Sequence, residues 1–432
     1  MTVPNIRYVI SPKLPLIRRR IVETLLILRA RWEEFFNKRC LVGFPWFWPA
    51  GRFGERAMLD ARRIVRQRFG HDYHPIPRAL AKVLVTIAWP PAVLVHLWQI
   101  RRGYGAEAVP MKRAPGALWT AMRHNVWPCD YYAYELWHPD RRVKIDNYLY
   151  TSEATRLFKV LNRPSQPDPI GDKLAFHDLC NVHVLPTPAL LAAFAPTAKL
   201  MEFESGRPPE RDLFVKPRLG FGGDGAERFH WDGVAFQNDS ACRLKPEDLC
   251  DYLETRARKE NRTLLVQPLL SNHPDLCVAN GSLATARLVT GRSTDGKVVA
   301  IFGYLYFSQL DQGRWHVEGL IDLTTGRVMS APLQHTSSLT HRLHQFGSND
   351  GCTLPEWDLA LRYAKIAHRV CPNFAFVGWD LAFTNHGPML LEGNANWSAN
   401  TYQLLRGEPL GQTMFAVVLA THLRLEIGDK RI

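Results

Sequence analysis

The 432-residue sequence lacks the cysteine spacing of a disulfide scaffold or a zinc knuckle. Its eight cysteines are scattered along the chain and none belongs to a C-x-x-C pair. This usage is typical of a reduced, cytoplasmic setting and makes cysteine-based catalysis a weak hypothesis. The first residues, MTVPNIRYVI, also lack the charged-then-apolar plan of a signal peptide. We therefore expect a cytoplasmic protein.

Acidic residues are scarce in the N-terminal third. Residues 1–150 contain 25 Lys and Arg against 11 Asp and Glu, a net charge of +14, whereas the remaining 282 residues contain 29 against 30. Eight of the thirteen Trp also lie in residues 1–150. A basic, Trp-rich region indicates contact with an anionic surface, either a membrane or nucleic acid. The simpler alternative is a helical domain whose solvated faces are basic. Nucleic acid is the weaker partner because no RNA-recognition signature is present.

Long uncharged runs are also rare, and residues 83–100 form the notable one. The run VLVTIAWPPAVLVHLWQI contains no Asp, Glu, Lys or Arg and is bounded by Lys82 and Arg101. It is barely long enough to cross a bilayer, and Pro90-Pro91 interrupts it in the middle. Two buried helices joined at the prolines are the first interpretation. An interfacial or re-entrant helical hairpin is the second, and a true membrane span is the least favoured.

The pattern of the chain changes near residue 171. Before it, apolar spacing predicts helices over 17–39 and 56–70, an aromatic loop over 43–53, and a helical connector over 114–170. After it, short strand-like runs such as DLFVKP, LLVQPLL, ATARLVT and KVVAIFGYLYF alternate with helical stretches over 246–260 and 355–370. This mixture predicts an α+β fold over residues 145–432, preceded by a helical, basic, Trp-rich region over 1–144.

Two acidic residues lie in segments that otherwise read as buried strands. In FVGWDLAFTNHGPMLLEGNAN (376–396), Asn385-His386-Gly387 predicts a three-residue hairpin turn. A symmetric register around this turn pairs Thr384 with Pro388, Ala382 with Leu390, and Asp380 with Glu392. Side chains alternate along a strand, so Asn394 shares the face of Glu392.

Two like charges directly opposite each other are destabilising unless a cation lies between them. Carboxylate and amide oxygens are the ligands that Mg²⁺ prefers. The hairpin therefore predicts a metal site formed by Asp380, Glu392 and Asn394. The alternative is an exposed edge hairpin whose acids are solvated.

A glycine-rich loop follows the strand-like run LFVKP. Its glycines are Gly220, Gly222, Gly223 and Gly225, and the following AERFHW alternates like a strand. A dinucleotide fold would need a helix there, and neither a Walker motif nor a protein-kinase arrangement is present. Strand, glycine loop and strand form a flap that can offer backbone N–H groups to phosphates. The alternative is a plain hairpin with a flexible turn.

These pieces occur in an order that resembles the ATP-grasp superfamily over about residues 145–425. Within it, the chain most resembles the sugar-transfer-associated group that is related to α-L-glutamate ligases. The segments that carry the resemblance are DKLAFHDLCNVHVLPTP, FVKPRLGFGGDG, LLVQPLLSNHPDL, SLATARLVT, GLIDLTTGRV, LPEW and GWDLAFTNHGPMLLEGNAN.

The resemblance implies an ATP-grasp fold, in which two α+β subdomains hold the nucleotide between them. The flap subdomain would span about 200–265 and the metal-ligand subdomain about 270–425. The implied nucleotide-binding residues are Lys173 and Lys216 at the phosphates, Gly220, Gly222, Gly223 and Gly225 in the flap, and Gln267 and Leu269 near the adenine.

The resemblance also implies catalytic roles for Lys216 and Arg287, with Arg287 stabilising charge on the transferring phosphoryl group. A structural salt bridge is the alternative role for Arg287. Asp380, Glu392 and Asn394 match the magnesium ligands of the family, in agreement with the hairpin argument. The chain departs from the usual Asn-Thr-x-Arg pattern in having Ala284 at the first position, which puts one ligand or substrate contact in doubt.

The predicted function is that of a carboxylate–amine ligase that uses ATP and Mg²⁺ (or Mn²⁺) and acts through an acylphosphate. The family's link to sugar transfer suggests a small-molecule or glycan-linked carboxylate and amine, or an amino acid, as substrates. A phosphotransferase acting on a hydroxyl group is the first alternative. A non-catalytic lipid- or RNA-binding protein with a vestigial ATP site is the second. Peripheral contact of 1–144 with anionic lipid at the inner face of the membrane remains open.

Overall fold

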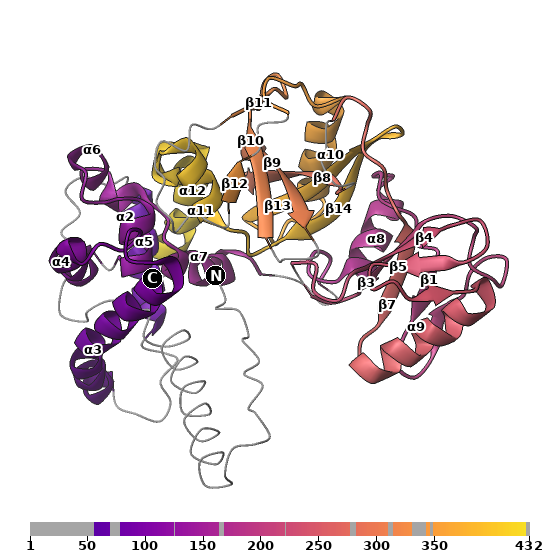
Figure 1. Cartoon of the computed structure of the whole chain (residues 1–432). Coiled ribbons are helices and arrows are strands. Elements are labelled where there is room, and N and C mark those ends of the chain that lie inside the picture. Colours follow the sequence, from indigo (N-terminus) through magenta and orange to yellow (C-terminus); the bar gives the residue numbers. More distant parts are fainter. Residues whose placement is uncertain are drawn as a thin grey trace, which may run out of the picture. The chain divides into compact units, whose positions relative to one another are not determined.

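The computed structural model describes nine stretches of the chain, which fall into two compact units (Figure 1). The described residues are 56–69, 78–124, 126–163, 168–220, 222–276, 282–309, 314–330, 343–345 and 349–428. Unit 1 is formed by 1–157, 335–339 and 408–411, and unit 2 by 158–334, 340–407 and 412–432. The predicted helix over 17–39 and loop over 43–53 lie outside the described residues. The predicted boundary at residue 144 and the subdomain limits stay predictions.

The described part of unit 1 is helical, as the sequence predicts. Its elements are α2 (Arg56–Phe69), α3 (Arg78–Tyr104), η2 (Met111–Arg113), α4 (Ala114–His124), α5 (Pro128–Ala133), α6 (Pro139–Arg142) and η3 (Ile145–Asn147), followed by α7 (Thr151–Leu161), which crosses the limit between the units. Helix α2 confirms the basic helix predicted over 56–70. The side chain of Arg62 points from α2 into the core and is buried.

Helix α3 corrects the interpretation of residues 83–100 as two helices joined at the prolines, or as a helical hairpin. It runs without interruption through Pro90 and Pro91. A proline keeps a helical φ, but it removes its own N–H from the hydrogen-bond ladder and its ring crowds the carbonyl group four residues earlier. Both prolines are exposed, so water can satisfy the carbonyl groups that they release. No helix among the described residues has the length and apolar character needed to cross a membrane.

The first sheet of unit 2 contains the glycine loop. Its strand order is β2-β1-β7-β3-β4-β5-β6. The strands are β1 (Ala192–Phe194), β2 (Lys199–Met201), β3 (Leu213–Pro217), β4 (Glu227–Trp231), β5 (Phe236–Asn238), β6 (Arg243–Leu244) and β7 (Leu264–Pro268). Helix α9 (Pro246–Glu260) packs on it through Leu249, Leu253 and Ala257, which are fully buried against the apolar side chains of the sheet. The loop joins the antiparallel strands β3 and β4, which confirms the predicted strand–loop–strand flap.

The second sheet of unit 2 contains the acidic hairpin. Its order is β11-β10-β9-β8-β13-β14, with β12 beside β10. The strands are β8 (Ala284–Arg292), β9 (Val298–Gln309), β10 (Arg314–Ile321), β11 (Val328–Met329), β12 (Leu343–Gln345), β13 (Phe376–Thr384) and β14 (Gly387–Asn394). The remaining helices of this unit are α8 (Lys173–Val182), α10 (Trp357–Arg369), α11 (Ala399–Arg406), η6 (Leu410–Gln412, of which 410 and 411 belong to unit 1) and α12 (Met414–Gly428).

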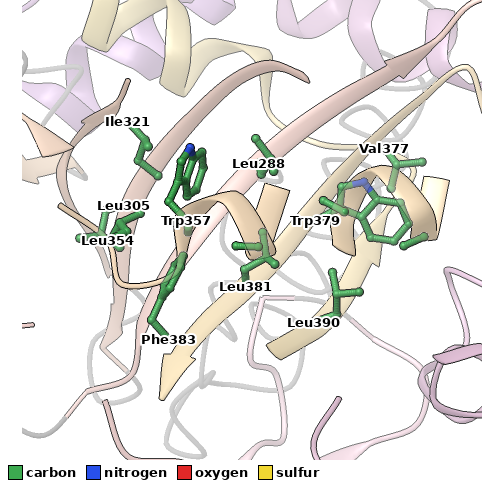
Figure 2. Close-up of a cluster of buried hydrophobic side chains, with 14 of the residues drawn as sticks. Leu288, Leu305, Ile321, Leu354, Trp357, Val377, Trp379, Leu381, Phe383 and Leu390 are labelled. Atoms are coloured by element: carbon green, nitrogen blue, oxygen red, sulfur yellow. The ribbon is translucent and has the colours of Figure 1, made fainter. Parts of the chain in front are cut away.

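Alternation along β13 assigns its side chains to two different environments. Val377, Trp379, Leu381 and Phe383 join the core that α10 covers (Figure 2). The intervening Phe376 lies on the other face, where its ring is 4.5 Å from that of Phe415 in α12. Asp380 follows Phe376 at a spacing of four residues and therefore lies on the α12 side of the sheet. Burial of the α10 face thus fixes the face on which the acid lies.

The hairpin register corrects one part of the prediction and confirms another. Thr384 pairs with Gly387, so the turn has two residues, not three, and the predicted pairs of Thr384 with Pro388 and Ala382 with Leu390 are wrong. The register shifts between Asp380 and Leu381, where β14 contains one extra residue, Leu391. This β-bulge restores the pairing of Asp380 with Glu392.

Candidate active site

The three predicted metal ligands converge on one face of the β13–β14 hairpin. The Asn394 amide nitrogen lies 3.1 Å from Asp380 Oδ2 and 3.3 Å from Glu392 Oε1. Among the described residues, no group of three or more His, Cys, Asp or Glu side chains is arranged to hold a metal ion. Asp380, Glu392 and the Asn394 amide are the side chains at this hairpin that could offer oxygen ligands to a cation.

Arg287 reaches Asp380 from the neighbouring strand β8, where the two residues are direct partners. Its Nε lies 2.8 Å from Asp380 Oδ1, and its Nη2 donates to Oδ2 at 3.1 Å. The Nη2 contact is a hydrogen bond, whereas Nε and Oδ1 are close but not aligned for one and form an ion pair. Burial alone would lower the pKa of Arg287, but the charges of Asp380 and Glu392 raise it above its ordinary value. The guanidinium therefore stays charged.

The two carboxylates are in unequal environments. Burial raises the pKa of Asp380 to about 7, and the charge of Glu392 adds to the rise while Arg287 opposes it. Burial acts in the same direction on Glu392, but Lys173, Lys216 and Arg287 outweigh it and lower its pKa. Glu392 is therefore the more firmly ionised member of the pair.

Two lysines reach toward these carboxylates, Lys216 from the first sheet and Lys173 from α8, whose Phe176 and Cys180 pack in the core of the second sheet. Lys173 is the first residue of α8, which Asp172 caps by accepting from the backbone N–H of Leu174 at 3.0 Å. The Lys173 Nζ lies 3.6 Å from Glu392 Oε2 and donates to the Gly220 carbonyl at 2.6 Å. It therefore links the glycine loop to the acidic hairpin.

Lys216 lies in β3, immediately before the glycine loop. Burial lowers its pKa to about 8, and the charge of Lys173 adds to this effect, while Glu392 and Asp380 oppose it. The structure thus brings together both predicted phosphate-binding lysines and the two predicted acidic ligands.

The four glycines of the loop adopt backbone conformations that favour glycine. They have positive φ values of 131°, 73°, 75° and 74° at Gly220, Gly222, Gly223 and Gly225. Such angles strain any residue with a Cβ. Asp224, the acid within the loop, pairs with Arg262 at 3.0 Å, and its side chain is 70% exposed. Its charge is thus partly neutralised by a partner outside the loop.

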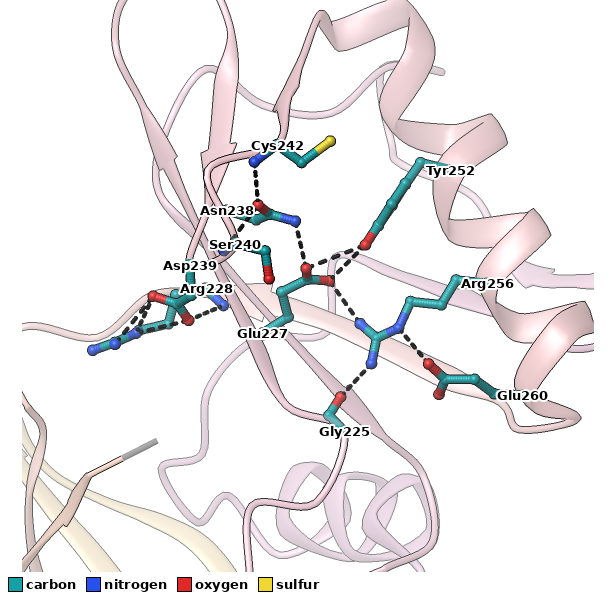
Figure 3. Close-up of polar contacts among 10 residues, drawn as sticks. All are labelled: Gly225, Glu227, Arg228, Asn238, Asp239, Ser240, Cys242, Tyr252, Arg256 and Glu260. Carbon is teal, nitrogen blue, oxygen red and sulfur yellow. Dashed lines mark hydrogen bonds and ion pairs between the residues drawn. The ribbon is translucent and has the colours of Figure 1, made fainter. Parts of the chain in front are cut away.

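A network of polar side chains holds the second half of the loop (Figure 3). Arg256 of α9 donates to the Gly225 carbonyl at 2.6 Å and to Glu227 Oε2 at 2.8 Å. Glu227 also accepts from Asn238 at 2.6 Å and from the Tyr252 hydroxyl at 3.2 Å. The loop therefore rests on a base that is fixed by α9 and β5.

The proposed adenine-binding residues lie in and after β7, but their polar groups are already engaged. The Gln267 side chain is buried and donates to the Pro188 carbonyl at 3.2 Å. The backbone N–H of Leu269 donates to the Asp212 carbonyl at 3.0 Å. Of the backbone groups of Leu269, the carbonyl is thus the one left to face a base. The adenine-binding role of both residues stays a prediction.

Two buried tyrosines of β9 complete the surroundings of Asp380 and were not identified from the sequence. Tyr306 is hydrogen-bonded to the Asp380 carboxylate, and Tyr304 lies opposite Arg287 across the β8–β9 pair. Burial raises the pKa of both phenols, so both are neutral donors at ordinary pH. The alternation of GYLYF (303–307) places them on one face and was the available signal.

Comparisons with known proteins found one family match and several similar solved structures. The family model of sugar-transfer associated ATP-grasp proteins matches residues 152–417, and no curated protein matches the chain. One similar solved structure is an ADP complex of N5-carboxyaminoimidazole ribonucleotide synthetase, at 10% identity over 53% of this chain and 45% of the other, with a TM-score of 0.33. Another is D-alanine–D-alanine ligase from Bacillus anthracis with ATP, at 13% identity over 61% and 69%, with a TM-score of 0.34.

The two kinds of similarity differ in what they establish. The match to the synthetase covers less than half of that protein's length, and its TM-score supports no functional argument. The family match instead covers well over half of the 432 residues here and confirms the α+β, ATP-grasp class predicted from the sequence. The chain belongs to the sugar-transfer associated ATP-grasp family.

Proposed function

We propose that unit 2 is an ATP-dependent carboxylate–amine ligase that works with Mg²⁺ or Mn²⁺. The observation that carries the proposal is the surplus of positive charge at the hairpin. Three cations, Lys173, Lys216 and Arg287, face two carboxylates, Asp380 and Glu392. A surplus of cations beside a glycine loop suits the phosphates of a nucleotide.

The donors at the hairpin fit a magnesium ion. Asp380 and Glu392 offer carboxylate oxygens, and the Asn394 amide already lies within 3.3 Å of both. A half-turn of that amide exchanges its nitrogen for its oxygen, which turns a donor to the carboxylates into a metal ligand. When bound, the ion would neutralise charge on the nucleotide phosphates.

The residues of the chain would then contribute positioning and charge. Lys216, from β3, and Lys173, from the start of α8, would both bind phosphate oxygens. Arg287 would move part of its hydrogen bonding from Asp380 to the phosphoryl group that leaves ATP, since its second contact with Asp380 is the longer one, at 3.1 Å. The glycine loop would cover the phosphates and exclude water.

Phosphoryl transfer to a carboxylate, the first step of a ligase reaction, releases no proton, whereas transfer to a hydroxyl does. In the described part of the site both carboxylates are engaged with Arg287, Lys173 and Asn394. In the second step of the ligase reaction, the proton that the amine loses would pass to the phosphate that leaves or to water. The family's description suggests that the substrates are linked to sugar transfer. Product analysis separates the alternatives, because a ligase yields ADP with an amide and a phosphotransferase yields ADP with a phosphoester.

The experiment that tests the proposal is ATP turnover by Asp380→Asn against a panel of carboxylates and amines. We expect a loss of at least about 10³-fold, which corresponds to about 4 kcal/mol of activation free energy. Asp251→Asn, on an exposed turn of α9, is the matched control and should retain activity within about twofold. Isothermal titration of ADP with and without Mg²⁺ provides a second readout. Equal turnover by Asp380→Asn and the parent would contradict the metal assignment.

A further inference from the structure

Helix α3 of unit 1 is apolar on two opposite faces, and one of them is exposed. One face packs into the unit through Trp89, Val93, Leu97 and Ile100, which are all buried. The other face consists of Val83, Ile87, Leu94, Val95 and Trp98, whose exposed fractions range from 43% to 69%. A helix that is apolar all round is normally buried on all sides or lies against lipid. The exposed side of α3 therefore needs an occupant.

The exposed side chains form a continuous stripe. Val83, Ile87, Leu94 and Trp98 are separated by four, seven and four residues, and the exposed Pro91 lies between Ile87 and Leu94. These spacings place them on one side of an α-helix. The stripe is about 22 Å long at 1.5 Å per residue. Sixteen large apolar side chains are exposed among the described residues, and eight of them belong to unit 1. Because unit 1 is the smaller unit, its described surface is richer in large apolar side chains than that of unit 2.

Basic residues border the stripe. Helix α3 contains no acid, and its last turn carries Arg101 and Arg102. The Arg102 guanidinium lies 5.3 Å from the ring centre of Trp98. Arg101 donates to the Val109 carbonyl at 2.7 Å, which holds the following segment near the end of α3. That segment leads into the exposed Lys112 and Arg113 of η2.

We propose that the stripe of α3 binds the surface of a membrane that contains anionic lipid, with the helix lying in the plane of the surface. Aliphatic side chains would enter the boundary between headgroups and acyl chains. Trp98 would lie at that boundary, and Arg102, Lys112 and Arg113 would contact lipid phosphates. This goes beyond the ligase function, because it assigns unit 1 a partner and places the enzyme at a lipid surface.

Two other occupants fit the stripe less well. Nucleic acid is bound through phosphate contacts and, for single strands, through stacking on aromatic rings. Four of the five exposed side chains of the stripe are aliphatic and serve neither purpose. A second copy of the chain would bring a second region of net charge +14 against the first, and like charges repel at such a contact. A membrane surface that is anionic and partly apolar complements both the positive charge of unit 1 and the apolar stripe of α3.

The test is co-sedimentation of the full chain with vesicles of phosphatidylcholine alone and of phosphatidylcholine with about 30% phosphatidylglycerol. We expect binding to the anionic vesicles that weakens as salt is raised. The variant Ile87→Gln/Leu94→Gln/Trp98→Gln should bind at least about tenfold more weakly. A matched variant, Val182→Gln/Val184→Gln/Val234→Gln, removes three exposed apolar side chains of unit 2 and should bind like the parent.

A second variant tests the charge. Arg102→Gln/Lys112→Gln/Arg113→Gln should lose affinity for anionic vesicles by about fivefold per residue, and its binding should depend less steeply on salt than that of the parent. Absence of vesicle binding by the parent would overturn the proposal, as would unchanged binding by the apolar variant. Conversion of a parental dimer into a monomer by the apolar variant, or binding of RNA in preference to vesicles, would assign the stripe to the other occupants. Since ATP turnover is measured without vesicles, failure here leaves the ligase proposal intact.

Discussion

Among the described residues, Arg62 of unit 1 and Arg287 of unit 2 are both paired with acids and have little exposed side chain, but their sets of partners differ. In unit 1, Arg62 donates to both oxygens of Glu153 at 2.9 and 3.1 Å, to the carbonyl and carboxylate of Asp146 at 3.0 and 3.1 Å, and to the Tyr148 carbonyl at 2.7 Å. In unit 2, the hydrogen bonds and ion pairs of Arg287 that lie within the described residues end on Asp380.

The difference separates a structural role from a functional one. Every nitrogen of the Arg62 guanidinium is engaged, and one cation faces two carboxylates, so the cluster has no need of a further anion. Arg287 shares its acids with two lysines, so its cluster has one positive charge in excess. A buried charge whose partners are complete stabilises the fold, whereas a buried surplus of charge indicates the place of a ligand.

Replacing each arginine by Met tests most directly whether one is structural and the other functional. Arg62→Met leaves two buried carboxylates without their cation and should lower the free energy of unfolding of unit 1 by about 3–5 kcal/mol. Arg287→Met should cost less stability, because Asp380 can take up a proton near neutral pH and Lys173 and Lys216 still face Glu392. Its ATP turnover should fall by at least about 10²-fold.

Urea denaturation followed by circular dichroism measures the first effect, and turnover measures the second. Arg102→Met, on the exposed side of α3, is the control for stability and should stay within about 0.5 kcal/mol of the parent. Equal losses of stability in Arg62→Met and Arg287→Met would show that the two clusters have the same role.

A third arginine–acid cluster, at the base of the glycine loop, is expected to affect both stability and ATP binding. Arg256 binds both Glu227 and the Gly225 carbonyl, and its side chain is mostly buried. Arg256→Met should lower the free energy of unfolding by about 1–3 kcal/mol and raise the KM for ATP, because the loop loses its fixed base. Hydrogen exchange of residues 222–227 would report the loosening.

Arg228→Met is the control for this change. Arg228 pairs with Asp239 at 3.1 Å in the same sheet, but away from the loop and more exposed. It should cost less than about 1 kcal/mol and leave the KM for ATP unchanged. A parental KM in Arg256→Met would mean that the loop positions itself without α9.

The acidic hairpin shows how far sequence reasoning reaches at this site. The identity of the residues on one face followed from alternation, and the pairing of Asp380 with Glu392 is confirmed. The turn was wrong by one residue, and the bulge at Leu391 compensated for it. The register near a turn depends on local backbone geometry, which the alternation of side chains along a strand does not determine. The pairing was therefore predicted correctly from an incorrect turn.

The residues that the sequence did not reveal act across strands or between elements. Tyr306 reaches Asp380 from β9, which is two strands away from β13 in the sheet. The contact of Lys173 with Gly220 joins residues 47 positions apart. Likewise, the continuity of α3 through Pro90 and Pro91 depends on solvent at the released carbonyl groups. Such contacts follow from tertiary packing and not from local pattern.

The pH dependence of ATP binding tests whether the surplus charge of unit 2 matters. Lys216, with its pKa lowered to about 8 by burial, loses its charge as the pH rises through that value, and with it the attraction to phosphate. The Kd for Mg–ATP should rise about tenfold between pH 7 and pH 9. Lys216→Arg keeps its charge throughout. The ratio of the Kd of the parent to that of this variant therefore reports the effect of deprotonating Lys216. A ratio that stays constant over this range would contradict a phosphate contact by Lys216.

Alanine substitutions at two glycines of unit 2 separate the effect of backbone strain from an effect on ATP binding. Gly222, in the loop, and Gly206, outside it, have φ values of 73° and 72°, and a Cβ at either position would meet no atom within 4 Å. Alanine at either site should therefore lower the free energy of unfolding by the same amount, about 1 kcal/mol, because a left-handed backbone is strained by any Cβ. Only Gly222→Ala should also weaken ATP binding, since a Cβ in the loop would stand between its backbone N–H groups and the phosphates. If both variants bound ATP like the parent, the loop would be a plain turn, and the positive surplus at Arg287, Lys173 and Lys216 would have to bind its anion without a lid.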